Sequence, residues 1–198
     1  MMDLTGCPTM SLNFKEPKVK DLINSGKLWH LIKHFDEEGY IMTGGTPGEQ
    51  MWSDGKKPEE QKDELQGKSS LVPGHAYSII AAKEAKGHKL LQIRNPWGNF
   101  EWDGDWSDNS QLWTREMIDI IKPNFDAADG TFWMSYKDFT DNFESLDVCR
   151  VRNWEEARIR GRFIRFSDSD NTTVDHIMSK WIYALDVPRK SHVIITLN

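Results

Sequence analysis

Residues 74–106 read GHAYSIIAAKEAKGHKLLQIRNPWGNFEWDGDW, and this stretch decides the fold of the chain. An apolar run over residues 76–82 follows His75, and a polar connection containing Gly87 leads to a second run over residues 89–94. Two β-prone runs joined by a short, glycine-containing connection predict an antiparallel hairpin. If the chain reverses near residue 85 or 86, residues whose numbers sum to about 170 face each other across the hairpin.

His75 and Asn95 satisfy this sum, so the hairpin is expected to bring an imidazole and a carboxamide together at its open end. The Asn95 side chain can accept a hydrogen bond from one ring nitrogen, which leaves the other nitrogen free to take a proton from a nucleophile. Trp97 is placed to cover that bond and to keep water away from it. The three residues form half of a Cys-His-Asn apparatus. The alternative for a histidine at the start of a strand is a solvated or structurally bonded side chain.

The composition limits the class of protein. With 198 residues the chain has the length of one large domain or of one and a half ordinary ones. An apolar content of 38%, with nine Trp and nine Phe, is enough for a packed core. The formal net charge of −6 argues against nucleic acid as the main partner. The basic, aromatic run at residues 160–166 is expected to be the two faces of one strand rather than a binding patch.

The first residues show no signal-peptide pattern, and no run approaches the roughly 18 apolar residues of a transmembrane helix. Cys7 and Cys149 lie far apart in the sequence and do not suggest a disulfide framework. We therefore expect a soluble, cytoplasmic chain in a reducing compartment.

The rest of the chain alternates helical and extended patterns. Apolar spacing predicts a helix over residues 17–39, broken or kinked at Gly26, and a short amphipathic helix over residues 114–122 that Thr114 caps and whose Met117, Ile120 and Ile121 face inward. The remaining expectations are a strand at 40–43, a long polar loop at 46–70, a strand at 131–134, a helix capped by Ser135 at 135–143, and three short strands ending near 166, at 181–185 and at 193–197.

A carboxylate-rich segment follows the hairpin. Glu101, Asp103, Asp105 and Asp108 alternate with tryptophans on a segment without regular periodicity. Clustered hard oxygen ligands are what Ca²⁺ prefers, although the spacing does not match an EF-hand. Asp103 and Asp105 have solvated turn positions as their simpler interpretation.

The runs GHAYS, RNPWG, EWDGDWSD and DGTFWMSYKDF, at residues 74–78, 94–98, 101–108 and 129–139, together resemble the His/Asn half of the calpain protease core. Calpains are intracellular, calcium-regulated, papain-like cysteine endopeptidases that act on polypeptides. The resemblance covers roughly residues 3–150 and continues more weakly to the end. It implies an α+β fold: a papain-like half-domain over residues 1–150, with an antiparallel sheet or barrel and flanking helices. Residues 151–198 would then be the truncated start of a C2-like β-sandwich.

By this resemblance, His75 matches the general base of the family, Asn95 the residue that orients it, and Trp97 its shield. The resemblance also implies a calcium site, with Glu101, Asp108 and Asp129 at ligand positions and the carbonyl of Ala127 as a further ligand. A family carboxylate two residues after Asp129 is Thr131 in this chain, which implies a weakened site.

The chain lacks a recognisable nucleophile. Cys7 lies in a Thr-Gly-Cys-Pro turn with no helix behind it, and it does not match the Gly-x-Cys-Trp-type nucleophile segment of the family. We therefore predict a fragment of a calcium-dependent cysteine endopeptidase that is inactive alone and needs the Cys-bearing half, in cis or in trans. The alternative is a non-catalytic, calcium-responsive interaction or regulatory module of the same fold. A Trp-rich carbohydrate binder is a third possibility, but tryptophans packed in the core explain their number better.

Overall fold

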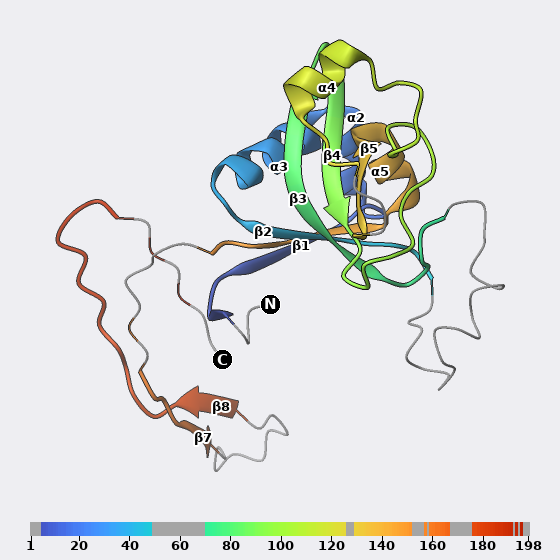
Figure 1. Cartoon of the computed structure of the whole chain (residues 1–198). Helices are drawn as coiled ribbons and strands as arrows, with labels where there is room; N and C mark the ends of the chain where they lie inside the picture. Colours follow the sequence, from blue (N-terminus) through green and yellow to red (C-terminus); the bar gives the residue numbers. More distant parts are fainter. Residues whose placement is uncertain are drawn as a thin grey trace. The chain divides into compact units, whose positions relative to one another are not determined.

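The computed structural model describes residues 5–48, 70–125, 129–151, 157, 159–166, 176–191, 193 and 195 (Figure 1). The chain divides into two compact units, Met1–Arg152 and Asn153–Asn198. The first is α+β, as the sequence predicts. Its elements are β1 (Thr9–Asn13), α2 (Pro17–Asn24), α3 (Lys27–Glu37), β2 (Ile41–Gly45), β3 (Ala76–Ala85), β4 (His88–Arg94), α4 (Arg115–Ile121), β5 (Thr131–Ser135), α5 (Tyr136–Asn142) and β6 (Ser145–Cys149). None of the helices in the described part of the chain has the length and apolar character needed to cross a membrane.

The six strands of the first unit form one sheet in the order β1-β6-β2-β3-β4-β5, and every neighbouring pair is antiparallel. Figure 1 shows a strongly twisted sheet in which β1 and β2 run across the view while β3 and β4 rise towards α4. The β3–β4 hairpin is therefore the long central feature of the sheet, and it is built by the segment 74–106.

The hairpin turns later than its sequence suggests. Lys86 (φ 52°) and Gly87 (φ 81°) both adopt left-handed backbone, which is the conformation of a two-residue type I′ turn. Ala85 consequently faces His88, and paired residue numbers sum to 173 near the turn and to 172 beyond an irregularity between Ile79 and Ala81. The expected sum of about 170 is thus wrong by two to three positions, because the turn is centred on residues 86 and 87.

The predicted break at Gly26 is confirmed. Gly26 has a left-handed backbone (φ 73°) and separates α2 from α3. The caps of the later helices are also as expected: Thr114 Oγ1 accepts a hydrogen bond from the N–H of Met117, and Ser135 Oγ accepts one from Asp138. Ile120 was expected to face inward but is 48% exposed, because the inward face of α4 is formed by Met117 and Ile121, four residues apart.

Apolar side chains pack on both faces of the sheet. On one face, α3 and α5 cover β3, β4 and β5, and the main core lies between them. A smaller aromatic cluster, which includes Trp106, Trp133 and Met117 of α4, packs on the other face. Leu90 joins the smaller cluster and Leu91 the main core, as the alternation of side chains along a strand requires. The hairpin is therefore held on both faces.

The second unit contains one described strand pair, β7 (Phe163–Phe166) with β8 (His176–Ser179). The strand expected to end near residue 166 is present, but residues 181–185 form no strand, and Ile182 is fully exposed at 102%. A β-prone run without partner strands has no apolar face on which to pack, so propensity alone does not make it a strand. The expected strand at 193–197 lies mostly outside the described residues. The C2-like sandwich stays a prediction.

Candidate active site

His75 directly precedes Ala76, the first residue of β3. Gly45 of β2 faces Ala76, so Thr46 occupies the next position, opposite His75. The N–H of Thr46 donates to the carbonyl oxygen of His75 at 3.0 Å, which fixes the histidine backbone to the end of β2. The His75 side chain is half-buried. The imidazole therefore projects from a backbone held by the sheet.

Asn95 directly follows β4, is fully buried, and reaches the His75 ring. Its Oδ1 lies 2.9 Å from Nε2 of His75. The β3–β4 pairing ends with Ser78 opposite Arg94, so the two residues are not ladder partners. The N–H of Asn95 instead donates to the carbonyl oxygen of Gly130 at 2.7 Å, on the β5 side. The side-chain contact expected from the sequence is present although the register behind that expectation was shifted.

The surroundings of Asn95 determine which end of its amide faces His75. Nδ2 donates to the carbonyl oxygens of Asn99 at 2.5 Å and Phe100 at 3.4 Å, while Oδ1 accepts from the N–H of Trp97 at 3.1 Å. The reverse orientation would direct an amide oxygen at two carbonyl oxygens and an NH₂ group at an N–H. Since Oδ1 must face the histidine, Nε2 is the protonated ring nitrogen and Nδ1 carries the free lone pair.

Two aromatic rings enclose the imidazole. The Trp97 ring lies 4.2 Å from the His75 ring, centroid to centroid, at an angle of 41°. The Tyr77 ring lies 5.0 Å from the His75 ring at an angle of 79°, in an edge-to-face arrangement. Both rings limit rotation of the imidazole. Trp97 thus lies against the His75 ring, and its role as a shield of the bond to Asn95 stays a prediction.

The turn after Asn95 packs tightly against Gly130. The N–H of Gly98 donates to the carbonyl oxygen of Asn95 at 3.0 Å. Gly130 has φ 79°, and a Cβ atom there would lie 2.7 Å from both the Asn95 carbonyl oxygen and Gly98 Cα. Real Cβ contacts are not that short, so only glycine fits at position 130. This close approach helps to fix Asn95.

Burial lowers the pKa of His75, and the hydrogen bond to Asn95, which acts in the opposite direction, is the smaller effect. The ring is therefore neutral at pH 7 with Nδ1 available, which is the protonation state that a general base needs. Burial also raises the pKa of Tyr77 to about 12, and the neutral hydroxyl accepts a hydrogen bond from the N–H of Val72 at 2.8 Å.

Three carboxylates lie around the Gly130 turn. Glu101 Oε1 accepts a hydrogen bond from the N–H of Gly130 at 2.9 Å, and Asp129 Oδ1 accepts one from the N–H of Thr131 at 2.6 Å. Burial, and to a smaller degree the negative charges of Glu101 and Asp129, together raise the pKa of Asp108 to about 6. These carboxylates are therefore close enough to repel one another.

This group has the donor chemistry that suits Ca²⁺. Asp108 Oδ1 is buried and has no hydrogen-bond partner, so it is an atom that a cation would satisfy. Glu101 and Asp129 each keep one oxygen outside the backbone bonds given above. Across the described ranges, however, no three His, Cys, Asp or Glu side chains are arranged as a metal site. Ala127 lies outside the described residues, and the calcium site remains a prediction.

Neither cysteine lies beside His75. Cys149 faces Ile41, the first residue of β2, whereas His75 is opposite Thr46, just past the last one. Five strand positions of about 3.4 Å separate the two by roughly 17 Å. Cys7 lies beyond the Cys149 end, since β1 begins at residue 9 and pairs there with Cys149. Both thiols are free. A nucleophile for His75 is therefore not found among the described residues.

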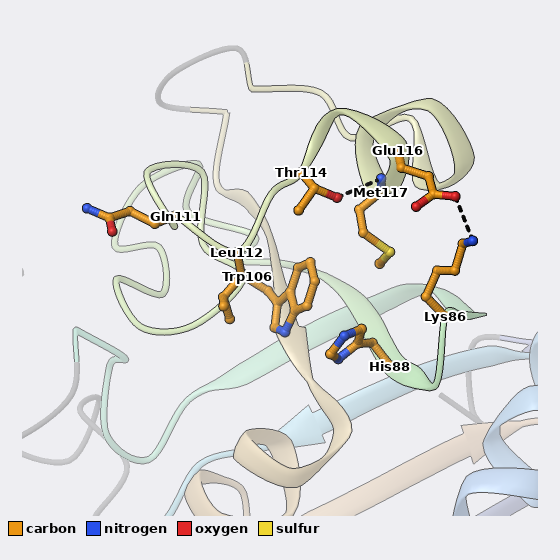
Figure 2. Close-up of a pocket in the computed structure, with 8 residues that line it drawn as sticks. All are labelled: Lys86, His88, Trp106, Gln111, Leu112, Thr114, Glu116 and Met117. Atoms are coloured by element: carbon orange, nitrogen blue, oxygen red, sulfur yellow. Dashed lines mark hydrogen bonds and ion pairs between the residues drawn. The ribbon is translucent and has the colours of Figure 1, made fainter.

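A cavity of about 340 Å³ lies at the opposite end of the hairpin. Figure 2 shows Trp106, Met117 and His88 around its centre, with an ion pair between Lys86 and Glu116 at one side. The ten residues of β3, about 33 Å, separate it from His75. The cavity is thus distinct from the His75–Asn95 pair. Its lining residues are Lys86, His88, Trp106, Gln111, Leu112, Thr114, Glu116 and Met117.

Sequence reasoning missed three residues that hold the pair in place: Thr46, Tyr77 and Gly130. The sequence predicts Thr46 at the start of a long loop, but Thr46 continues the β2–β3 pairing by one position. The apolar run over residues 76–82 predicts Tyr77 only as a core residue. A tyrosine two residues from the histidine in the same strand shares its face, and this signal was available.

Comparisons with known proteins point to one protein family. The family model of the calpain family cysteine proteases matches residues 1–150. A calpain-type cysteine protease, ADL1, from Oryza sativa subsp. japonica is 40% identical over 152 residues, which are 76% of this chain and 6% of that protein. The calpain-type cysteine protease DEK1 of Zea mays is 39% identical over a region of the same extent.

A relative from an animal matches a shorter part of this chain. The calpain-1 catalytic subunit of Rattus norvegicus is 37% identical over 113 residues, or 50% of this chain and 16% of that protein. The chain thus spans only a small part of each of these relatives.

Proposed function

Because the chain belongs to the calpain family of cysteine proteases, we propose that it supplies the general base of a site that hydrolyses peptide bonds. The observation that carries this proposal is the His75–Asn95 pair, with the Asn95 amide oriented so that Nδ1 of His75 is the free nitrogen. The substrates are polypeptides, in keeping with a protease family.

The chemistry proceeds in two halves. Nδ1 of His75 takes the proton of a cysteine thiol, and the thiolate attacks the peptide carbonyl carbon to form a C–S bond. When the C–N bond breaks, the protonated His75 gives that proton to the leaving amine. His75 then takes a proton from water as it hydrolyses the thioester, and returns it to the thiolate. Asn95 holds the ring in one tautomer throughout, and Trp97 keeps water from the bond between them.

The thiol has to come from another polypeptide segment. Cys149 lies roughly 17 Å along the sheet from His75, and Cys7 lies beyond it. We therefore propose that the chain is inactive alone and is completed by a Cys-bearing half, in cis or in trans. Two free thiols and no disulfide among the described residues suit a reducing, cytoplasmic compartment.

We also propose that Glu101, Asp108 and Asp129 bind a Ca²⁺ ion. A bound divalent cation neutralises mutually repelling carboxylates. Glu101 also holds the N–H of Gly130, whose carbonyl holds Asn95, so order among the carboxylates supports the position of Asn95. Thr131 in place of a further carboxylate lowers the negative charge of the site and so its affinity.

A second candidate function is a non-catalytic, calcium-responsive interaction module. The lack of a thiol beside His75 in the described part of the chain favours it. The two candidates differ in one respect: only the first requires the free lone pair of His75 Nδ1.

The test joins the chain to the segment that precedes the matched region in the rice relative, and measures cleavage of an unfolded polypeptide with Ca²⁺ present. We expect no cleavage by the chain alone, cleavage by the fusion, and a loss of at least about 10²-fold in the His75→Ala fusion. His30→Ala, on the exposed face of α3, is the matched control and should leave the rate unchanged. A folded fusion that binds Ca²⁺ but never cleaves would favour the second candidate.

A further inference from the structure

Thr46 is one of three buried polar residues in the described part of the chain, together with Asn95 and Ser107, and only 5% of it is exposed. Two of these three, Thr46 and Asn95, contact His75. Burial of a polar side chain is unfavourable unless its hydrogen bonds are made, so each such residue needs a structural reason. The reason for Thr46 lies in how the β2–β3 pairing ends.

At a regular antiparallel position, the N–H of His75 would donate to the backbone carbonyl of the residue opposite. It donates instead to the side-chain Oγ1 of Thr46, at 2.9 Å, while the N–H of Thr46 donates to the carbonyl of His75. The hydroxyl of Thr46 has therefore replaced a backbone carbonyl as acceptor. A side chain without an oxygen at position 46 would leave the N–H of His75 without this partner.

The same hydroxyl also holds the loop that leads into His75. Since Oγ1 accepts from His75, its own proton is free to donate to the carbonyl oxygen of Val72, at 2.7 Å. The N–H of Val72 donates to the hydroxyl of Tyr77, whose ring edge contacts the His75 imidazole. Thr46, Val72, Tyr77 and His75 thus form a closed ring of contacts.

We propose that Thr46 is a positioning residue for His75: its hydroxyl sets the backbone from which the imidazole reaches Asn95, and so sets the direction of Nδ1. This inference rests on the proposed function of His75 as general base. Thr46 touches neither substrate nor nucleophile in this role and acts only through His75. A displacement of a reacting group by about 1 Å can lower a rate by about 10²-fold, so a positioning role has a large effect on catalysis.

The test compares four substitutions in the full chain. Thr46→Val keeps the shape and removes the hydroxyl, Thr46→Ser restores it, and Thr46→Cys offers a weaker acceptor. Thr140→Val is the matched control, because the Thr140 hydroxyl also donates to a backbone carbonyl, that of Lys137, but on helix α5. The readout is the ¹⁵N chemical shift of each His75 ring nitrogen, which reports the tautomer without any need for catalysis.

We expect wild type, Thr46→Ser and Thr140→Val to show His75 as a single Nε2–H tautomer. Thr46→Val should move the tautomer ratio about fivefold towards the mixture of an unrestrained imidazole, the equilibrium factor of one net hydrogen bond. Unchanged His75 shifts in folded Thr46→Val would overturn the proposal. If Thr46→Val does not fold, identical His75 shifts in Thr46→Cys and Thr46→Ser would overturn it equally.

The proposed function is tested separately. In the fusion described above, Thr46→Val should lower kcat by about tenfold or more with little change in KM, and Thr46→Ser should recover most of it. If the wild-type fusion is inactive while the His75 shifts respond as expected, the function as a protease fails and the positioning of His75 stands.

Discussion

Glu101 and Gly130 are joined by a hydrogen bond of 2.9 Å, from the N–H of the glycine to the carboxylate. The carbonyl oxygen of the same glycine accepts a hydrogen bond from the N–H of Asn95 at 2.7 Å. One peptide position therefore lies between the acidic residues and the residue that orients His75. Neighbouring backbone atoms leave no room for a side chain at position 130, so a substitution of Gly130 is the most direct way to disturb the His75–Asn95 pair.

Gly130→Ala should destabilise the fold and release His75. The new Cβ would lie 2.7 Å from the Asn95 carbonyl oxygen, on a backbone with φ 79°. We expect a loss of about 2–4 kcal/mol in the free energy of unfolding, from left-handed strain together with the clash. Chemical denaturation measures it. Gly87→Ala is the control, since Gly87 has φ 81° with nothing within 4 Å of its added Cβ, and should lose only about 1 kcal/mol. Equal losses in both variants would show that space at Gly130 does not matter.

The His75–Asn95 contact could be predicted from the sequence because this prediction does not need the exact strand register. The hairpin follows from two β-prone runs, and its open end brings the two residues near each other even when the register is off by two. The turn at Lys86 and Gly87 was misplaced because Lys is not a residue whose sequence signal favours left-handed backbone. Side chains as long as His and Asn then bridge the remaining offset.

The positions that support the pair were harder to find. The need for glycine at position 130 comes from close contacts with residues more than 30 positions earlier in the chain. The role of Thr46 comes from its hydrogen bond to His75, which lies 29 positions later. Such long-range contacts leave no periodic trace in the sequence. Ile120 shows the opposite limit: Met117, Ile120 and Ile121 have the spacing of one helix face, but only Met117 and Ile121 are buried, and periodicity alone does not show where the edge of that face lies.

The stability of the chain should fall as the pH drops below 6.5, in part because of His75. Burial lowers the pKa of His75 in the fold, so between that lowered value and 6.5 the unfolded chain binds more protons than the folded chain. Stability from this group is therefore fully present above pH 6.5 and is lost as the pH falls towards the folded pKa. Because the ring is half-exposed, we expect less than about 1 kcal/mol.

Denaturation at pH 7.5 and pH 5.5 measures this effect against His75→Gln, which does not titrate. The loss between the two pH values should be smaller in the variant than in the wild type. A loss of the same size in both would mean that other groups account for all of the acid sensitivity.

Removal of the hydroxyl group from Tyr77 and from Tyr136 should change the stability of the fold in different ways. The Tyr77 hydroxyl accepts a hydrogen bond from the buried N–H of Val72, so Tyr77→Phe should cost about 1–3 kcal/mol at pH 7. The Tyr136 hydroxyl is buried with no partner, so Tyr136→Phe should be neutral or stabilising. Thermal unfolding of both variants at one pH measures the difference. A larger loss in Tyr136→Phe than in Tyr77→Phe would contradict the hydrogen-bond assignment around His75.

Asp108→Asn should separate the two roles of the acidic residues. Burial and the charges of Glu101 and Asp129 raise the pKa of Asp108 to about 6, so at pH 7.5 its ionised form destabilises the metal-free fold. Removing that charge should raise the metal-free melting temperature by about 2–4 °C, which corresponds to about 1 kcal/mol once partial solvent screening is allowed for. Ca²⁺, by contrast, should stabilise the wild type and have little effect on the variant, because the variant lacks a ligand charge. Melting curves without metal and calorimetric titration with Ca²⁺ measure the two effects.

The matched control is Asp103→Asn, because Asp103 is exposed and accepts a hydrogen bond from Ser70 Oγ. If Asp108→Asn lowers the metal-free melting temperature, the Asp108 carboxylate stabilises the metal-free fold through hydrogen bonds and is not a cation ligand. If Asp108→Asn keeps the Ca²⁺ response, calcium is bound elsewhere.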